Sequence, residues 1–511
     1  TLCRDQDLMR YVFHRTDDPI IERVCQLNQV SPDELDVGDF QPDHQMKILQ
    51  DFREKLLSYR DKRFFIVGDY DCDGICATTI MKKLFDDLGI ASNHYIPSRI
   101  REGYGLNERI VKIAAENDFD VLLCVDNGIV ANDELALAKT LGLKTFVIDH
   151  HEYEKAPDTD FLHPSLFPEG YEDMCAAGLC ALFSNSIRPD RLSTVYGGIA
   201  TLADMVRVLG YNRYLIKNAV KILNEETIYP IAYLAKNKEC DYTALSYDVI
   251  PKINAVSRMD DMLNVNYVVR YLLDNSSDCM AYLNKIEEIN TLRKDLTKQM
   301  SALAQRIIDP ERKIIIVSSS AFREGLCGLI ANRLMNEYGK PVIVLAESDG
   351  ILKGSGRAVR GSDLYAYLSQ RKDLFLTFGG HAQAVGLSME KKDLDELQRY
   401  IDENPFEYEE YEKDVLVLDP DKIDMDLLDE LKSLEPFGTG FEEPLFALED
   451  ISYKQKFLVA SRYPKFILND RLEAISFHPA HQNRTFETML GHLKKDDYHK
   501  GKISFVIEDL I

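Results

Sequence analysis

The sequence lacks any stretch of 18 or more uncharged apolar residues, and this absence argues against a transmembrane helix. Its first five residues (TLCRD) do not open a long apolar run of the kind found in signal peptides, and they do not begin with Met. We therefore expect a cytoplasmic protein that has no membrane partner.

Cysteine is present, but not at the spacings of a zinc site. Ten cysteines are scattered along 511 residues, and no CxxC pair occurs among them. Cys72 and Cys76 are four positions apart, and Cys175 and Cys180 are five apart. The sequence therefore fits no zinc template, and the cysteines are interpreted as reduced thiols.

Positive charge is scarce. The chain has 61 Lys and Arg against 85 Asp and Glu, a net charge of −24. Because affinity for phosphate comes from Lys and Arg, this balance does not favour a nucleic-acid binder, although a local basic groove and metal-binding carboxylates remain compatible with it. A composition that is 45% hydrophobic and 29% charged excludes a wholly disordered or collagen-like chain.

Short apolar runs alternate with helix-like stretches from residue 61 onward. The runs at 64–67, 121–125 and 145–148 are separated by helical spacing at 77–88 and 108–115. This alternation predicts a mostly parallel α/β sheet that is covered on both faces. A second, smaller α/β region starts at 313–317, continues with a strand at 341–345 and runs to about 400.

The remaining segments suggest how the chain is divided. Residues 279–308 are highly charged with apolar residues at helical spacing, which predicts a long connecting helix. Short alternating runs at 457–459, 465–468, 472–477 and 503–507 predict an OB-like β-barrel at the C-terminus. We expect an N-terminal helical extension (1–60), a parallel-sheet α/β domain (61–278), the connecting helix (279–310), a smaller α/β domain (311–410) and the barrel domain (411–511).

Each of the first three predicted strands ends at acidic or imidazole side chains. They run into Asp69-Tyr70-Asp71-Cys72-Asp73-Gly74, Asp126-Asn127-Gly128 and Asp149-His150-His151. Each string alone is weak evidence, since DxDxDG and Asp-Asn-Gly are common in turns and an HH pair is more often structural. The carboxyl ends of parallel strands meet at one edge of a sheet, so the coincidence of all three predicts a Mn²⁺ or Mg²⁺ site.

The strings GDYDCDG, VDNG and DHH resemble the DHH phosphoesterase superfamily, and further motifs resemble its RecJ-type exonucleases. These motifs are IPSR (96–99), EGYGLN (102–107), LADMV (202–206), PKINAVSRM (251–259), GSGR (354–357), GGHAQAVG (379–386) and LEPFGTG (434–440). Ser257 stands where the family usually has Gly, and Phe441-Glu442 replaces its Asn-Pro. The resemblance covers about residues 60–511, so that 61–278 would be the DHH catalytic domain and 311–410 the DHH-associated substrate-binding domain.

This resemblance implies a set of metal ligands and catalytic residues. One divalent cation would be held by Asp69, Asp71 and Asp126, and the other by Asp73, Asp126, His150 and Asp204, with Asp126 as the bridge. Asp149 would orient His150 or His151. His151 would contact the scissile phosphate and assist the leaving oxygen.

Phosphate-binding residues are also implied. The arginine candidates are Arg99, Arg101, Arg258, Arg357 and Arg360. A second candidate is the Gly379-Gly380-His381 segment, whose backbone N–H groups could hold an anion. Neighbouring small residues at 382, 384 and 386 predict close backbone packing at a helix start. In relatives this segment binds the terminal phosphate, which would make an exonuclease.

The predicted barrel contains aromatic side chains that could stack on bases, although such side chains are more often core. They are Tyr453, Phe457, Tyr463, Phe466, Phe477 and Phe486. Basic residues are interleaved with them, namely Lys454, Lys456, Arg462, Lys465, Arg471 and Arg484.

The resemblance implies a 5′-to-3′ exonuclease that hydrolyses phosphodiester bonds of single-stranded DNA by a two-metal mechanism. It would release 5′ mononucleotides in DNA repair and recombination, act as a monomer, and have a single-strand-binding protein or a helicase as a partner. Two alternatives remain open. One is a DHH phosphodiesterase acting on short oligonucleotides, cyclic dinucleotides or pAp, which would usually lack the barrel. The other is an inactive DNA-binding scaffold, which would have lost metal ligands.

Overall fold

The structure, a computed structural model, describes residues 9–15, 17–38, 40–236, 238–457, 463–477, 481, 484–496 and 501–511. The fold divides into two compact units. The first contains Phe40–Val206 and Tyr211–Glu410, and the second contains Met9–Asp39, Arg207–Gly210 and Tyr411–Ile511. The division at Glu410 falls inside the acidic stretch 403–413 of the sequence.

A parallel sheet of five strands organises the N-terminal half of the first unit. Its order is β3 (Ser92–Tyr95), β2 (Phe64–Val67), β4 (Val121–Val125), β5 (Lys144–Ile148) and β6 (Asp160–Leu162), and every neighbouring pair is parallel. The strands β2, β4 and β5 are those expected from the apolar runs. The predicted α/β fold class is confirmed.

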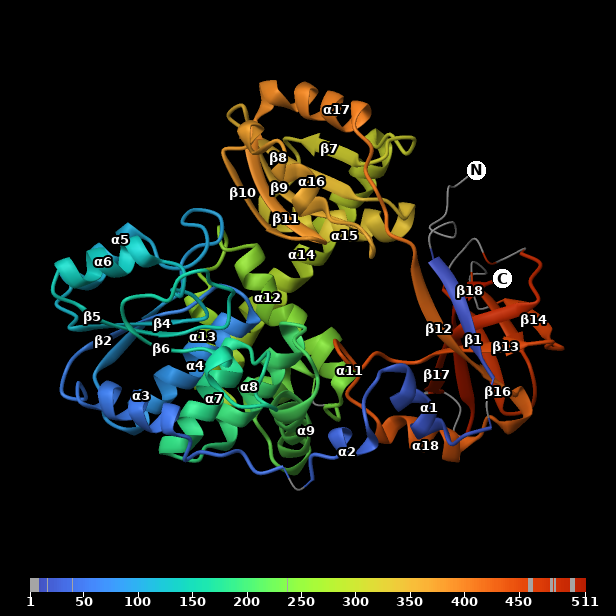
Figure 1. The fold of residues 1–511 in the computed structure, drawn as a ribbon, viewed down its shortest axis with the longest axis horizontal. Coiled ribbons are helices and arrows are strands. Elements are labelled where there is room, and N and C mark those ends of the chain that lie inside the picture. Colours follow the sequence, from blue (N-terminus) through green and yellow to red (C-terminus); the bar gives the residue numbers. More distant parts are fainter. Residues whose placement is uncertain are drawn as a thin grey trace. The chain divides into compact units, whose positions relative to one another are not determined.

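Helices cover both faces of this sheet (Figure 1). The side chains of Phe64 and Ile66 point into one core, with α3 (Lys47–Leu57), α4 (Cys72–Asp87), α7 (Ala176–Ile187) and α8 (Arg191–Ala203). Phe65 and Val67 point into a second core with α5 (Glu108–Glu116) and α6 (Asn132–Thr140). Successive residues of a strand face opposite sides, so a strand buried on both sides is apolar throughout.

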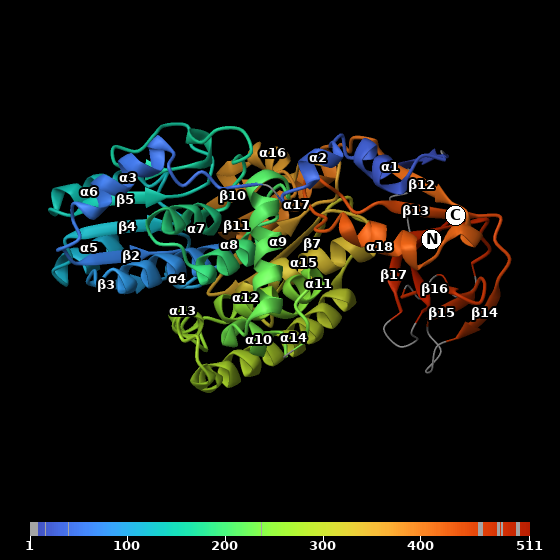
Figure 2. The same ribbon diagram turned by 90° about the horizontal axis from the view of Figure 1, so that it is seen from below.

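A helical region follows the sheet. It consists of α9 (Gly210–Glu225), α10 (Tyr229–Leu234), α11 (Tyr242–Ala244), a π-helical turn η3 (Leu245–Val249), α12 (Ile250–Arg258) and α13 (Asn266–Leu273). A short 3-10 turn η4 (Ser277–Cys279) leads into α14 (Met280–Ile307), which is the long helix predicted from residues 279–308. This helix is packed rather than free, because α10, α12 and α13 lie against it in the described part of the chain (Figure 2).

A mixed sheet forms the rest of the first unit. Its order is β10 (Thr377–His381), β11 (Ala384–Glu390), β9 (Ile351–Arg357), β8 (Val342–Ser348) and β7 (Ile315–Ser319), with only β7 and β8 parallel. Its helices are α15 (Glu324–Tyr338), α16 (Leu364–Ser369) and α17 (Leu394–Glu403), with 3-10 turns η5 (Lys372–Leu374) and η6 (Lys391–Asp393).

The prediction of a helix start near residues 379–386 is wrong. These residues form the hairpin of β10 and β11, in which Gly380 pairs with Val385 and His381 with Ala384. Gly380 has a left-handed φ of 135°, and a Cβ there would lie 2.2 Å from the carbonyl oxygen of Ala384. The small residues therefore allow a tight antiparallel turn between two strands, and they do not mark a helix start.

The second unit is built on an eight-stranded sheet. Its order is β1 (Met9–His14), β12 (Tyr411–Leu418), β13 (Leu445–Glu449), β17 (Thr488–Lys495), β18 (Ile503–Leu510), β16 (Leu472–Ser476), β15 (Pro464–Ile467) and β14 (Lys454–Phe457). Its helical segments are α1 (Ile20–Leu27), α2 (Pro32–Leu35), η7 (Pro420–Lys422) and α18 (Met425–Ser433). The predicted run at 457–459 extends beyond Phe457 into residues outside the described ranges.

The N-terminal segment differs from the predicted helical extension. Residues 9–14 form β1, which pairs in parallel with β12, so that Met9 lies opposite Tyr411 and His14 opposite Leu416. The segment belongs to the second unit up to its boundary near residue 39, whereas α3 belongs to the first. A six-residue strand carries too short a pattern to identify its partner some 400 residues later. In the described residues no helix is both long and apolar enough to cross a membrane.

Candidate metal centre

The segments that follow three strand ends, together with Asp204 at the end of α8, bring together the side chains that the sequence predicted as metal ligands. Three groups have ligand atoms that all lie within 4.8 Å of one another: Asp69, Asp71 and Asp126; Asp73, His150 and Asp204; and Asp126, His150 and His151. Asp126 belongs to two of the groups, as does His150. The arrangement places one aspartate between two sets of oxygen and nitrogen donors.

Local structure explains how the GDYDCDG string presents its carboxylates. Asp71 is the N-cap of α4, where its Oδ1 accepts hydrogen bonds from the backbone N–H groups of Asp73 and Gly74 at 2.9 and 3.1 Å. The string is therefore the beginning of a helix. Gly74 is required there, because a Cβ at this position would lie 2.4 Å from the carbonyl oxygen of Asp69.

Asp73 is held by a second helix. Its two carboxylate oxygens accept hydrogen bonds from the N–H groups of Ala176 and Ala177, each at 2.8 Å, at the start of α7. A carboxylate at a helix N-terminus is favoured by the helix dipole and by otherwise unpaired N–H groups. Asp73 is only 1% exposed and therefore has a fixed position.

Buried carboxylate oxygens remain without hydrogen-bond partners in this centre. The Oδ1 atoms of Asp69 and Asp126 are both buried and unpaired. Burial, followed by repulsion from Asp71, raises the pKa of Asp69 well above its usual value, and burial followed by Asp73 does the same for the pKa of Asp126. Leaving buried carboxylate oxygens without partners costs free energy. Bound cations would remove this cost, so the cluster fits a set of metal ligands.

Asp126 also has an unusual backbone. Its φ is 60°, in the left-handed region that non-glycine residues seldom adopt. The next residue, Asn127, donates from Nδ2 to the carbonyl oxygens of Val67 and Val125 at 3.0 and 2.9 Å. This side chain ties the ends of β2 and β4 together and fixes the direction in which Asp126 leaves the sheet.

His150 lies between three carboxylates. Its Nε2 is 3.4 Å from Asp126 Oδ1 and 3.8 Å from Asp73 Oδ2, and its Nδ1 is 3.6 Å from Asp204 Oδ2. Burial lowers the pKa of His150, which favours the neutral imidazole that ligates metals. Asp204 is the C-cap of α8, and burial, followed by Asp73 and Asp71, raises its pKa to about 8.

Asp149 organises the second histidine. Its Oδ1 lies 2.7 Å from His151 Nδ1 and accepts the N–H of His150, while its Oδ2 accepts the N–H of Ile129. Burial alone would raise the pKa of Asp149, but His151 outweighs it and lowers that pKa. Burial opposes charge on His151 as well, yet Asp149 raises the pKa of His151 to about 9. The pair therefore favours an imidazolium aimed at the centre.

Tyr104 is a site residue to which sequence reasoning assigned no role. Its hydroxyl donates to the carbonyl oxygen of Asp126 at 3.0 Å and lies 3.0 Å from Nε2 of His151. The flanking Gly103 and Gly105 both have left-handed φ angles, which lets the loop turn the tyrosine toward the centre. A tyrosine between two glycines in a loop after a strand was the available signal.

The same loop positions Arg99. Ser98 donates through its hydroxyl to Asp260 at 2.7 Å and through its N–H to Glu102 at 2.9 Å. The guanidinium of Arg99 lies 5.0 Å from the centre of the Tyr70 ring. Arg99 therefore projects from a braced loop beside the GDYDCDG segment.

Three of the predicted arginines, Arg99, Arg258 and Arg357, lie near one another in the first unit. Arg258 ends α12 and Arg357 ends β9. Burial, followed by the charges of Arg99, Arg293 and Arg357, lowers the pKa of Arg258 to about 9. Gly325 at the start of α15 lets that helix lie close to the end of α12, since a Cβ there would lie 2.1 Å from the carbonyl oxygen of Arg258.

Gly379, Gly380 and His381 are exposed in β10. Across the mixed sheet, His381 pairs with Ala384, which in turn pairs with Arg357. These residues therefore share one end of the sheet, but no described contact joins His381 to the carboxylate cluster. Their phosphate-binding role stays a prediction.

The aromatic candidates of the second unit separate by exposure. Phe466 is buried, whereas Tyr463 is 38% and Phe477 61% exposed, with ring centres 5.9 Å apart. Several basic candidates have acidic partners: Lys465 pairs with Glu473, and Arg484 with Asp509. Arg462 lies outside the described residues.

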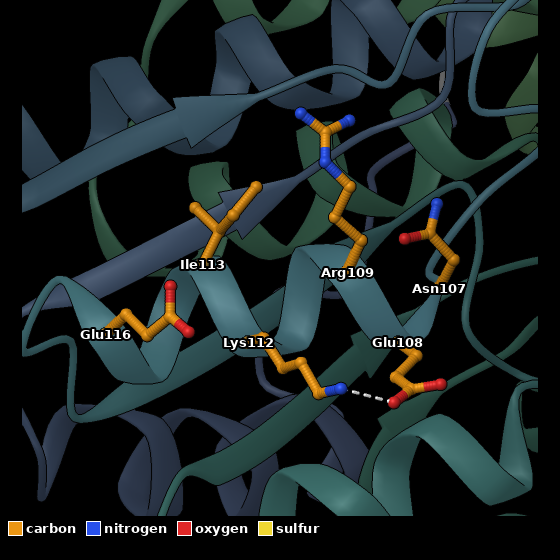
Figure 3. A pocket seen from close by; sticks show the side chains of 6 residues that line it. All are labelled: Asn107, Glu108, Arg109, Lys112, Ile113 and Glu116. Atoms are coloured by element: carbon orange, nitrogen blue, oxygen red, sulfur yellow. Dashed lines mark hydrogen bonds and ion pairs between the residues drawn. The ribbon is translucent and has the colours of Figure 1, made fainter.

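A separate hollow lies along α5, and none of the candidate metal ligands lines it. It has a volume of about 700 Å³ and is lined by Asn107, Glu108, Arg109, Lys112, Ile113 and Glu116 (Figure 3). Lys112 and Glu108 form an ion pair across one helical turn. An open, charged helix surface of this kind is typical of solvated protein and provides no candidate catalytic group.

Three family descriptions match the chain in sequence order. "DHH family, N-terminal domain" covers residues 63–203, "DHHA1 domain" covers 311–404 and "RecJ OB domain" covers 416–509. The chain thus contains, in this order, segments similar to a DHH domain, a DHHA1 domain and a RecJ OB domain. The last match identifies residues 416–509, which supply most of the second unit's sheet, as an OB domain.

Curated relatives and solved structures agree with this assignment. "Single-stranded-DNA-specific exonuclease RecJ" of Bacillus subtilis is 27% identical over 442 residues, which is 81% of this chain and 55% of that protein. The protein of the same name from Thermus thermophilus is 29% identical over 404 residues, which is 76% of this chain and 59% of that protein. The chain thus spans a little over half the length of these relatives.

The fold is similar to that of a solved RecJ. The crystal structure of RecJ in complex with Mn²⁺ from Thermus thermophilus matches with a TM-score of 0.83 at 23% identity. The match covers 99% of this chain and 80% of that chain. The described residues therefore share the RecJ fold in both compact units.

Proposed function

We propose that this chain is a metal-dependent exonuclease that hydrolyses single-stranded DNA from its 5′ end and releases 5′ mononucleotides in DNA repair and recombination. The proposal rests on the set of buried and half-buried ligand atoms in which Asp126 belongs to two groups of donors. The similarity to proteins named single-stranded-DNA-specific exonuclease supports the substrate class.

The donor set fits two divalent cations of the Mn²⁺ or Mg²⁺ type. Carboxylate oxygens with an imidazole nitrogen are the ligands that such ions accept, and two of the carboxylates have unpaired buried oxygens. One ion would be held by Asp69, Asp71 and Asp126, and the other by Asp73, Asp126, His150 and Asp204. When bound, the ions would offset the charge of the phosphodiester and lower the pKa of a bound water.

The protein's own side chains would supply orientation and a proton. His151, held by Asp149 and favoured as an imidazolium, would donate a hydrogen bond to the scissile phosphate and could pass its proton to the leaving oxygen. Arg99, Arg258 and Arg357 would hold phosphate oxygens, because guanidinium groups bind phosphate through paired N–H donors. Gly379, Gly380 and His381 would bind the strand end.

The alternative enzyme is a DHH phosphodiesterase acting on short oligonucleotides, cyclic dinucleotides or pAp. The match of the RecJ OB domain to residues 416–509 favours the exonuclease. An OB domain binds extended single strands through a groove and stacked bases, and a small-molecule phosphodiesterase has no use for such a groove. We further propose Tyr463 and Phe477, an exposed ring pair, as base-stacking residues.

One assay tests the proposal. Single-stranded and duplex DNA labelled at either end are incubated with the protein and Mn²⁺, Mg²⁺ or a chelator. Release of a 5′ label as mononucleotide from single strands, abolished by the chelator, is the expected result. Faster cleavage of dinucleotides or pAp would favour the alternative.

The remaining assignments are also proposals. The domain limits are those given above, with 61–278 as the catalytic domain and 311–410 as the substrate-binding domain. The proposed nucleic-acid partner is single-stranded DNA, the proposed protein partner is a single-strand-binding protein or a helicase, and the proposed working state is a monomer.

A further inference from the structure

Asp260 joins two loops of the first unit that are far apart in the sequence. It lies directly after the motif at 251–259, which ends α12. One of its carboxylate oxygens, Oδ2, accepts hydrogen bonds from the hydroxyl of Ser98 at 2.7 Å and from the backbone N–H of Ile100 at 3.2 Å. Ser98 and Ile100 flank Arg99, so a single oxygen holds the chain on both sides of that arginine.

The Ser98 hydroxyl carries this contact into the rest of the loop. Its oxygen also accepts the backbone N–H of Arg101 at 3.1 Å, as a hydroxyl can when it donates elsewhere. The Ser98 N–H donates to Oε2 of Glu102 at 2.9 Å, and the Ser98 carbonyl oxygen accepts the N–H of Glu102 at 2.9 Å. Residues 98–102 therefore form one hydrogen-bonded turn, which Asp260 fastens to the end of α12.

The segment that carries Asp260 is itself held in place. Asp261 forms an ion pair with Arg323, the N-cap residue of α15. The carbonyl oxygen of Arg258 lies so close to the same helix that a Cβ at Gly325 would be 2.1 Å from it. Contacts on both sides of Asp260 thus fix the backbone from which its carboxylate reaches the turn.

Arg99 lies against the candidate metal centre. Its guanidinium carbon is 5.0 Å from the centre of the Tyr70 ring, and Tyr70 stands between Asp69 and Asp71 in the chain. The Tyr70 ring meets that of Tyr104 edge to face, with 6.4 Å between ring centres. Among the described residues no ion pair engages Arg99, so its N–H donors remain available to an anionic ligand.

We propose that Asp260 is a positioning residue, which holds Arg99 beside the metal centre to bind a phosphate of the DNA strand. Asp260 does not touch the strand and acts through the turn at 98–102. The proposal rests on the proposed function and deepens it, because it adds a residue that no motif of the sequence singled out.

A second contact keeps the loop attached when Asp260 is lost. The side chain of Asn266 bonds both backbone groups of Ile96, accepting its N–H at 2.9 Å and donating to its carbonyl oxygen at 3.0 Å. Replacing Asp260 should therefore free the turn around Arg99 while the chain before it stays in place. The expected change is in the position of Arg99 and leaves the fold intact.

Two substitutions separate the accepting oxygen of Asp260 from its charge. Asp260→Ala removes the acceptor and should weaken DNA binding about tenfold, the loss expected when one charge-assisted phosphate contact is misplaced. Asp260→Asn keeps one side-chain oxygen, which suffices because a single oxygen accepts both bonds, and should bind within about twofold of wild type. Removing a negative charge near a phosphate would by itself strengthen binding, so a weakened Asp260→Ala protein is not explained by charge.

The experiment is a double-mutant cycle on the full chain. Anisotropy of a 5′-phosphorylated, 3′-fluorescein-labelled single-stranded 12-mer gives Kd in chelator, so no turnover is needed. Asp260→Ala is measured in the wild-type, Arg99→Gln and Arg357→Gln backgrounds. If Asp260 acts through Arg99, its loss should have no further effect once Arg99 is replaced, but should keep its full effect beside Arg357→Gln.

Controls address folding and general surface charge. Asp295→Ala removes an exposed aspartate from α14 and should leave Kd unchanged. Thermal melting of each variant verifies folding. If Asp260→Ala does not fold, Ser98→Ala takes its place in the cycle, since it removes the shorter of the two hydrogen bonds from the other side.

The outcomes separate the two proposals. Weakening by Asp260→Ala that disappears only in the Arg99→Gln background, with binding kept by Asp260→Asn, supports the positioning role. Equal weakening in all three backgrounds overturns it, as does unchanged binding by Asp260→Ala or by Arg99→Gln, or an Asp260→Asn protein as weak as Asp260→Ala. Failure of the wild-type chain to degrade single-stranded DNA in Mn²⁺ would overturn the proposed function, whatever the binding cycle gives.

Discussion

Nδ1 of His151 lies 2.7 Å from Oδ1 of Asp149, while the other ring nitrogen of His151 faces the hydroxyl of Tyr104. The imidazole is thus held from both sides, by a buried carboxylate that favours its charged form and by a phenol that is itself hydrogen-bonded to Asp126. This arrangement leads to two predictions about the rate of hydrolysis.

Replacing Asp149 by Asn should reduce kcat about 10- to 100-fold, a range typical for residues that orient a metal-site group. The amide keeps the shape but removes the charge that favours the imidazolium. Steady-state kinetics on single-stranded DNA with Mn²⁺ measure the effect. Asp158→Asn is the control, because Asp158 is an exposed partner of Lys139. Full activity of Asp149→Asn would contradict the orienting role.

Replacing Tyr104 by Phe should lower kcat about tenfold with little change in KM. The variant keeps the ring but loses the hydroxyl that contacts His151 and the Asp126 carbonyl, and a hydrogen bond to a charged group contributes about 1.5–3 kcal/mol. Tyr247→Phe, at a side chain that is 77% exposed, is the control. A rise in KM alone would instead indicate that Tyr104 contacts the nucleotide.

Asp126→Ala should abolish hydrolysis while leaving the fold intact, because this aspartate joins the two ligand groups. Mn²⁺ should raise the melting temperature of the wild-type chain by mass action on the folded state, and Asp126→Ala should remove that rise. Activity assays and melting curves with and without Mn²⁺ test both effects. Asp118→Ala is the matched control, since Asp118 is exposed and has a similar φ of 57°. Normal turnover by a folded Asp126→Ala protein would refute the bridging role.

Gly325→Ala should destabilise the first unit by about 1–3 kcal/mol, the usual cost of forcing an extra carbon into a packed contact. The added Cβ would lie 2.1 Å from the Arg258 carbonyl oxygen and would push α12 away from α15. The melting temperature should fall, and KM for DNA should rise as Arg258 shifts. At Gly386 a Cβ would meet nothing within 4 Å, so Gly386→Ala should change neither quantity.

The OB domain should lose part of its folding stability in acid, because an electrostatic interaction of Glu508 is lost there. The hydrogen bond from His492 and then that from Lys413 lower the pKa of Glu508 to about 2. Because the folded pKa lies below the unfolded value, the stabilisation is present above about pH 4.5 and is lost as the pH falls toward about 2. Since Glu508 is 41% exposed, the contribution should stay below about 1 kcal/mol. Urea midpoints of wild type and Glu508→Gln should therefore differ at neutral pH and converge as the pH approaches about 2.

Sequence periodicity predicted the part of the fold that local pattern determines. The strands β2, β4 and β5 are continuously apolar because helices cover both of their faces, and their polar ends follow directly. Asp69, Asp126 and Asp149 could therefore be placed at one edge from spacing alone. The strand at 9–14 was not predicted, because its partner strand is distant in sequence and its pattern covers only six residues.

Other site residues could not follow from spacing. Asp204 lies at the end of α8 and Arg357 at the end of β9. Their positions in the fold therefore depend on how the helices and the second sheet pack. The resemblance to RecJ proteins suggested these residues, and physical reasoning on the sequence did not. Tyr104 was missed because its contact with His151 arises from a hydrogen bond that only the tertiary structure creates.

The parallel pairing of β1 with β12 links the order of synthesis to the order of folding. About 400 residues separate these strands, so β1 leaves the ribosome long before its partner exists. The early segment must stay unpaired while residues 15–410 are made, and closing such a long loop is slow. We expect nascent chains that stall before residue 411 to leave residues 9–14 open to proteases, and completed chains to protect them.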